Sequence, residues 1–485
     1  MKVVVLGAGI GGLAVASRLR GLGYDVILLE KNKDVGGKAS LIKLDGYSFD
    51  AGPSLFTYPD WLDDVFLSCN KNPRDYYTYQ ELTTITRYFF NDKSFFDVFS
   101  DLDKTALSVE SATLFSKARF TSLIHHWKRI YTYSEKTFLK GKILINWSFF
   151  KTAISWLFNI GFRSIFLSMA SYNKLFVNNQ KVELFLNRFA TYTGSSPYNT
   201  PAFMNQLSVV ELSRGAYYPN GGIYSIPKAL EKLAIDLGVS IRKQANVVGI
   251  SKNSDKWNVI TSVENFSADL VISNMDFCVT KRLLGEQYEL PTTSLSSSGV
   301  VFYWGVAKQF DKLKLHNVFF SENYKKEFSQ IFNSCVIPEK PTVYVNVTSK
   351  IDANHAKNGC ENWFVMVNVP SSLEICNKES IAKLKKAVIN MLSSHLAENI
   401  EPLIEQEQLL TPNTLAENTN SYKGSIYGLN QNSLVKIMSR NPNKDNKHKG
   451  LFHVGGTVHP GGGIPLALLS AKNTAELIKN EYYAY

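Results

Sequence analysis

Short apolar runs next to glycine-rich turns predict buried strands in separate parts of the chain. Residues 3–6 form such a run, residues 13–20 repeat apolar positions at helical spacing, and residues 25–29 form a second run. Residues 268–274 and 451–454 have the same pattern, and each run leads into small or polar residues. Because parallel strands bind ligands beyond their carboxyl ends, we expect ligand-binding residues in the turns that follow these strands.

Other segments predict a second domain built on a mostly antiparallel sheet rich in aromatic residues. Its first two strands read as a hairpin around a polar turn. The predicted strands are residues 84–90, 95–99, 299–306, 343–347 and 363–367. Such a sheet suits a long apolar ligand, and an ordinary aromatic core is the alternative interpretation.

A helical, basic stretch lies between residues 102 and 198. Its apolar positions recur at intervals of three and four residues: Ile143, Trp147, Phe150, Ile154 and Leu157, then Phe158, Phe162, Ile165 and Met169. The formal net charge is +11, and residues 115–174 hold ten basic side chains against one acidic side chain. We therefore expect peripheral binding to an anionic membrane surface. A buried helix with a solvated basic face is the alternative, and no nucleic-acid motif accompanies the charge.

The composition is that of a large folded protein. With 485 residues, 45% hydrophobic and 20% charged, the chain is neither disordered nor of low complexity, and its length predicts about three domains. The five cysteines form neither a CxxC pair nor a plausible disulfide framework, so we predict no metal site. No run of about 18 apolar residues lacks a charge, and a membrane-spanning helix is not expected.

The first turn carries a dinucleotide-binding fingerprint. Gly7, Gly9 and Gly12 satisfy GxGxxG: they turn the chain, let the backbone approach a pyrophosphate, and permit close helix–strand packing. Glu30 follows the second strand, 18 residues after Gly12, where a carboxylate can accept hydrogen bonds from a ribose diol. This acid favours FAD or NAD over NADP. A glycine-rich turn without a nucleotide is the alternative.

The residues that follow favour FAD. Residues 31–38 add a second glycine pair followed by Lys38, and residues 49–54 spell FDAGPS. Both segments resemble the long dinucleotide motif of the glutathione-reductase-like flavoproteins, in their amine oxidase and carotenoid desaturase branch. That family has arginine where Lys38 stands, and a lysine meets a diphosphate as a point charge without the bidentate fork. The resemblance implies a discontinuous, Rossmann-like FAD-binding domain.

The carboxyl-terminal segment carries the most specific motif. Residues 459–465 spell HPGGGIP and resemble the HPGxGxP signature of bacterial carotenoid desaturases of the phytoene desaturase type, which embraces the isoalloxazine ring. Residues 463–472 look closer to the 3,4-desaturases of hydroxylated acyclic carotenoid ends. The resemblance implies contacts with FAD from Gly7, Gly9, Ile10, Gly12, Glu30, Lys31, Gly37, Lys38, Gly52, Pro53, Ser54, Leu55, Val247, Asn274, Leu429, Gly456, Thr457, Gly463 and Ile464.

The implied activity is FAD-dependent desaturation of a carotenoid, at C-3,4 of an acyclic end, with 1-hydroxylated ends included. This reaction moves a hydride to the flavin N5 and removes a proton from the neighbouring carbon, so the protein must mainly orient the polyene and exclude water. Arg188, Tyr192 and His459 are the candidate catalytic groups. The alternative interpretation is a structural ion pair for Arg188 and Tyr192, and a cap of a turn for His459. The alternatives are a carotenoid isomerase, an amine-oxidase-type flavoenzyme and a non-enzymatic prenyl-binding relative.

The expected domain order follows from these assignments. The FAD-binding domain comprises residues 1–75, 206–290 and 421–485, the substrate domain residues 76–101 and 291–420, and the helical membrane-docking insertion residues 102–205. We expect peripheral attachment at the cytoplasmic face of a bacterial membrane. The sequence does not indicate the oligomeric state or the electron acceptor.

Overall fold

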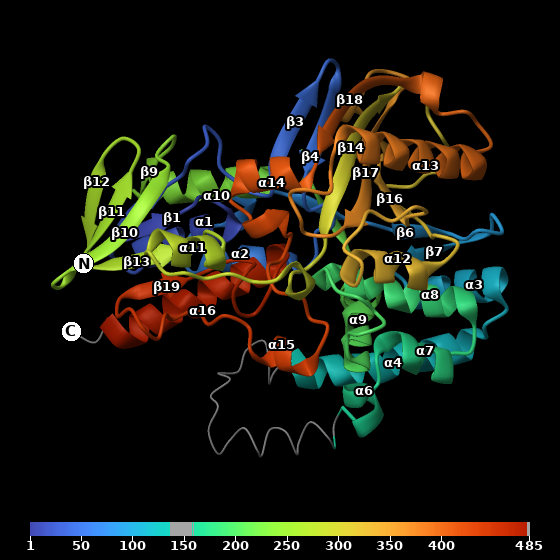
Figure 1. Cartoon of the computed structure of the whole chain (residues 1–485), viewed down its shortest axis with the longest axis horizontal. Helices are drawn as coiled ribbons and strands as arrows, with labels where there is room; N and C mark the ends of the chain where they lie inside the picture. The colour runs from blue at the N-terminus through green and yellow to red at the C-terminus, as the bar shows by residue number, and fades with distance from the viewer. Residues whose placement is uncertain (136–157, 159, 483–485) are drawn as a thin grey trace.

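A five-stranded parallel sheet organises one end of the molecule (Figure 1). The computed structural model describes residues 1–135, 158 and 160–482. The strand order is β19-β13-β1-β2-β9, so neighbouring strands come from three separate stretches of the chain. The strands are β1 (Lys2–Leu6), β2 (Asp25–Leu29), β9 (Ser240–Arg242), β13 (Leu270–Ser273) and β19 (Leu451–His453).

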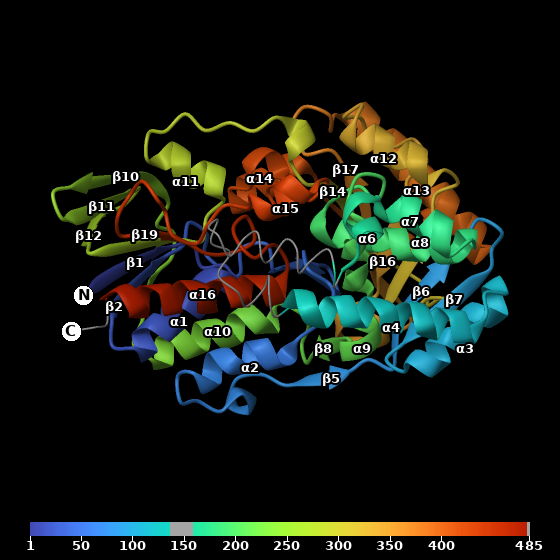
Figure 2. The same ribbon diagram turned by 90° about the horizontal axis from the view of Figure 1, so that it is seen from below.

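Both faces of this sheet are covered. Helix α1 (Ile10–Gly21) packs between α10 (Ser225–Asp236) and α16 (Ile464–Tyr482) on one face, as Figure 2 shows. A three-stranded antiparallel sheet covers the other face and forms its own apolar core with it. Its strands are β10 (Val247–Asn253), β11 (Lys256–Thr261) and β12 (Asn265–Ala268). Burial on both faces explains why β1 is apolar throughout instead of alternating.

The second large sheet has seven strands in the order β18-β14-β17-β16-β15-β6-β7. All pairs are antiparallel except β15 with β6, which confirms the expected mostly antiparallel sheet. Helix α13 (Lys378–Leu396) covers one face with its apolar side. The strands are β6 (Thr84–Phe89), β7 (Phe95–Phe99), β14 (Ser298–Val306), β15 (His316–Phe319), β16 (Val343–Asn346), β17 (Glu361–Val369) and β18 (Ile404–Leu410).

Helices pack against the β6–β7 edge of the second sheet and share its aromatic core. They are α3 (Leu102–Thr113), α4 (Lys117–Ser134), α6 (Phe162–Phe166), α7 (Met169–Phe176), α8 (Gln180–Arg188) and α9 (Ser208–Arg214). The side chains of the predicted apolar stripe differ in exposure: Ile165 and Met169 are buried, whereas Phe158 and Phe162 are exposed. The part of the stripe from Ile143 to Leu157 lies outside the described residues.

Helices α10 and α16 both carry a proline in their first turn, where a proline removes only an N–H that would have no helical partner. Pro227 is the third residue of α10, and Pro465 is the second residue of α16. Within the described ranges, no helix is both long and apolar enough to cross a bilayer.

Candidate functional site

A cavity of about 590 Å³ runs from the carboxyl edge of the parallel sheet to the second sheet. The end at the parallel sheet is lined by backbone and polar groups. Among them are groups of the loop at residues 7–12, called the glycine loop below, together with Glu30 and Asn274. Its other end is largely apolar, with walls from the second sheet and the helical region. These apolar walls include Tyr88, Phe203, Met204, Leu207, Val210, Val301, Val318, Phe364 and Met366.

Asn274 closes against the glycine loop. Its Nδ2 donates to the Gly7 carbonyl oxygen at 3.3 Å, and a β-carbon added at Gly9 would lie 2.7 Å from that same nitrogen. A β-carbon at Gly12 would lie 2.0 Å from the Gly7 oxygen. Side chains at these positions would therefore push the loop apart, and only glycine lets the backbone amides at the start of α1 face a ligand.

Glu30 holds the loop from the next strand. Its carboxylate accepts hydrogen bonds from the backbone N–H groups of Ala8 at 2.8 Å and Asn32 at 2.9 Å. The side chain is 5% exposed and lines the cavity, together with Val247 at the start of β10. The carboxylate therefore fixes the entrance to α1 and has further lone pairs for a ribose.

The two predicted lysines connect distant segments. Lys31 Nζ donates to Asn420 Oδ1 at 2.8 Å, and Lys38 Nζ donates to the Ser425 carbonyl oxygen at 3.2 Å. Burial lowers the pKa of Lys38 to about 8, although the carboxylate of Asp276 opposes the shift. Both side chains line the cavity. A contact of Lys38 with a diphosphate stays a prediction, because the Lys38 ammonium would first have to turn away from the Ser425 carbonyl oxygen.

Two backbone turns contribute to the cavity wall. They are Gly52–Leu55 after β4 (Tyr47–Ala51), and the turn at residues 456–463 before α16, of which Gly456, Thr457, Pro460, Gly462 and Gly463 line the cavity. At Gly463 the φ angle is +99°, and no atom lies within 4 Å of where a β-carbon would stand. At Gly462, in contrast, a β-carbon would lie 2.1 Å from the Tyr427 ring. The turn therefore presents bare backbone at Gly463, as contact with a flat ligand requires.

Arg440 was not identified from the sequence. Its guanidinium donates to the carbonyl oxygens of Val458 and Tyr427, both at 3.0 Å, and to that of Gly456. Burial lowers its pKa to about 10. Arg440 lines the cavity and holds the carboxyl-terminal turn in place, but no motif surrounds it in the sequence.

Three predicted residues are not among the described residues that line the cavity: Gly12, Leu429 and His459. Gly12 serves packing, as its position in the fingerprint predicts. Leu429 forms an isolated backbone bridge with Leu295. Burial, with a smaller effect of Arg440, lowers the pKa of His459 to about 4, so this imidazole is neutral at physiological pH.

Arg188 and Tyr192 both line the apolar part of the cavity. The Tyr192 hydroxyl donates to Glu211 Oε1, and burial raises the pKa of Glu211 to about 7. The Arg188 charge lies among Tyr324, Tyr192 and Tyr88, with Glu327 nearby. The structure therefore joins Tyr192 to a carboxylate that the sequence did not single out.

A second polar group in the wall was also missed. Ser54 Oγ lies 2.7 Å from the Tyr344 hydroxyl, which lies 2.7 Å from His316 Nδ1. Asn346 Nδ2 donates to the same His316 nitrogen at 3.0 Å. These residues meet because β15 pairs with β16 in a register that places His316 opposite Asn346, and a single sequence carries no signal for that register.

Three features together define an oxidoreductase that binds a dinucleotide cofactor. They are the glycine loop, Glu30 after β2, and the carboxyl-terminal turn that presents its backbone at Gly463. The family profile for flavin containing amine oxidoreductase matches residues 10–479, and the chain belongs to that family. Its cofactor is FAD, which the backbone cradle and Glu30 fit.

Relatives support this assignment over the whole chain. The chain is 40% identical to a 1-hydroxycarotenoid 3,4-desaturase of Flavobacterium sp. (strain P99-3), with 99% of each chain covered. It is 31% identical to a 4,4'-diapolycopene oxygenase of Methylomonas sp., covering 97% of this chain and 96% of the relative. An oxidoreductase structure from Methanosarcina mazei shares the fold, with a TM-score of 0.61, 17% identity and coverage of 98% of this chain and 100% of that one.

Proposed function

We propose that this FAD-dependent enzyme desaturates a carotenoid at C-3,4 of an acyclic, 1-hydroxylated end. The observation that carries the proposal is the apolar half of the cavity, which continues from the FAD cradle between the second sheet and the helices. The 40% identical relative, a 1-hydroxycarotenoid 3,4-desaturase, supports the choice of substrate and bond.

The residues of the chain act by binding and orientation. Bound FAD supplies the acceptor for a hydride. The aromatic and aliphatic walls hold the polyene in one register beside the Gly52–Leu55 turn and exclude water from the reacting carbons. His316, whose pKa is lowered to about 3 by burial, adds no positive charge to this wall at physiological pH. A neutral imidazole at this position avoids repelling the positive charge that develops when a hydride leaves the substrate.

The activity test uses the holoenzyme with a 1-hydroxylated acyclic carotenoid. We expect a product that has lost two hydrogen atoms and absorbs further to the red, because desaturation extends the conjugated chain. Mass spectrometry separates the alternatives: an isomerase leaves the mass unchanged, and an oxygenase adds oxygen. A product of unchanged or increased mass would contradict the proposal, as would oxidation of an amine with no action on carotenoids.

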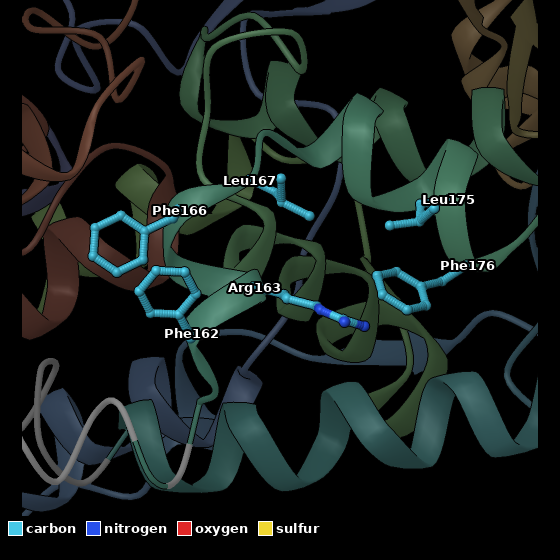
Figure 3. A pocket seen from close by; sticks show the side chains of 6 residues that line it. All are labelled: Phe162, Arg163, Phe166, Leu167, Leu175 and Phe176. Carbon is cyan, nitrogen blue, oxygen red and sulfur yellow. The ribbon is translucent and has the colours of Figure 1, made fainter.

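We also propose that the enzyme docks peripherally on an anionic bilayer at the cytoplasmic face, since its substrate is dissolved in lipid. A surface hollow of about 450 Å³ is lined by Phe162, Arg163, Phe166, Leu167, Leu175 and Phe176. In Figure 3, Phe162 and Phe166 lie side by side and Arg163 extends toward Phe176. Phe162, Phe166 and Leu175 are each more than 60% exposed. Exposed aromatic rings beside a guanidinium suit the interface between acyl chains and anionic headgroups.

Replacing Phe162 and Phe166 with serine should weaken binding to anionic liposomes by about tenfold or more, because each inserted phenylalanine contributes about 1.5–3 kcal/mol. Co-sedimentation at low salt measures the effect. Leu67→Ser is the matched control, since Leu67 is 60% exposed on α2 (Pro59–Leu67), apart from the hollow. Equal loss of binding in the control, or unchanged binding of the double variant, would contradict docking through this hollow.

A further inference from the structure

The cavity wall contains a buried imidazole whose second nitrogen has no partner. His316 is 2% exposed and lines the cavity. Its Nδ1 is engaged by Tyr344 and Asn346, whereas Nε2 makes no hydrogen bond with any residue that the structure describes. An unpaired buried polar group costs about 1–3 kcal/mol, so its retention in a built network calls for a ligand.

The surrounding contacts define which nitrogen of the His316 ring carries the proton. Asn346 Nδ2 donates to the Leu315 carbonyl oxygen at 3.0 Å, which fixes the orientation of the amide. The same NH₂ group therefore donates to His316 Nδ1, and that nitrogen must be the bare acceptor. Because burial keeps the ring neutral, its one proton resides on Nε2. His316 thus offers an N–H donor that requires an oxygen acceptor.

The position of this donor limits what the acceptor can be. Tyr344 links His316 to Ser54, and Ser54 belongs to the Gly52–Leu55 turn, which we expect to contact FAD. In a 1-hydroxylated end that reacts at C-3,4, the carbon bearing oxygen is two bonds from one reacting carbon and three from the other. Its hydroxyl must therefore lie close to the flavin, on the same stretch of wall as His316.

We propose that the Nε2–H group of His316 donates a hydrogen bond to the 1-hydroxyl oxygen of the substrate and thereby selects hydroxylated ends. Tyr344 is a positioning residue, because its hydroxyl holds Nδ1 and orients the ring. This inference rests on the proposed carotenoid substrate. It adds the residue that distinguishes a 1-hydroxylated end from the same end without oxygen.

The test compares two polar variants of the holoenzyme. His316→Gln can place an amide N–H near the position of Nε2, whereas His316→Asn can replace only the Nδ1 side. Dissociation constants are measured from the change in carotenoid absorption on binding, for an acyclic 1-hydroxycarotenoid and for the same carotenoid without the hydroxyl group. We expect the wild type to prefer the hydroxylated compound, the Asn variant to lose this preference by about tenfold or more, and the Gln variant to keep most of it.

Tyr344→Phe provides a second measurement with a small change of shape. It should lower the affinity for the hydroxylated compound more than the affinity for the compound without a hydroxyl group, whereas a general loss of folding would lower both equally. A preference that is the same in the wild type and the Asn variant, or absent from the wild type, would overturn the inference and indicate that water satisfies Nε2. Because binding is measured separately from turnover, a wild type that binds selectively but does not desaturate overturns the proposed function alone.

Discussion

Gly463→Val is expected to give a folded protein that lacks bound FAD. The turn at Gly463 has a φ angle of +99°, and no protein atom lies within 4 Å of a β-carbon placed there. A valine would therefore meet nothing in the protein but would fill the space that we assign to the flavin. Because the valine side chain would keep the flavin ring from lying against the backbone, the flavin absorbance of the purified protein should fall to near background.

A matched control separates backbone strain from ligand contact. Gly23, in the turn between α1 and β2, has a φ angle of +90° and also has no atom within 4 Å of a β-carbon. Gly23→Val therefore imposes a comparable strain of about 1–2 kcal/mol at a site remote from the cavity. It should lower the melting temperature as Gly463→Val does, yet retain FAD. Normal flavin content in Gly463→Val would show that this turn faces something else.

Glu30→Ala should also release FAD, by a different route. The carboxylate holds the N–H groups of Ala8 and Asn32 and is expected to accept hydrogen bonds from the ribose. Loss of charge-assisted hydrogen bonds corresponds to about 1.5–3 kcal/mol, or a tenfold or greater fall in affinity. Dilution followed by ultrafiltration measures how much FAD each protein retains.

Glu327→Ala is the comparison for this variant. Glu327 is 1% exposed and accepts hydrogen bonds from Thr342 N and Oγ1, but it is not among the described residues that line the cavity. Its loss should destabilise folding without releasing FAD. If Glu30→Ala and Glu327→Ala retained FAD equally, the ribose assignment would be wrong.

The cofactor end of the site was predictable because its signals are local. Gly7 to Glu30 lie in one strand–helix–strand unit, so their spacing alone specifies the turn, the helix start and the acid. Asn274 was found from its place after a buried strand. Lys38 shows the limit of such reasoning: its hydrogen-bond partners in residues 425 and 426 depend on how the third segment returns to the first.

The substrate end was less predictable because it depends on tertiary pairing. His316 and Tyr344 approach only through the register of β15 with β16, and Ser54 joins them from the turn after β4. Nothing in the residue types marks this juxtaposition. The helical stripe shows the same limit, since periodicity predicted one apolar face but did not indicate that Phe162 is exposed and Ile165 buried.

The three-part parallel sheet has a consequence for how the chain is made. Strand β1 lies between β2, which leaves the ribosome soon afterwards, and β13, whose other neighbour β19 is translated near the end. Helix α16, which packs on α1, follows β19. The FAD cradle therefore cannot close during translation, and the nascent chain must carry its first apolar strands without their final partners. A ribosome stalled before residue 451 would hold a chain able to build much of the second sheet but unable to retain its flavin.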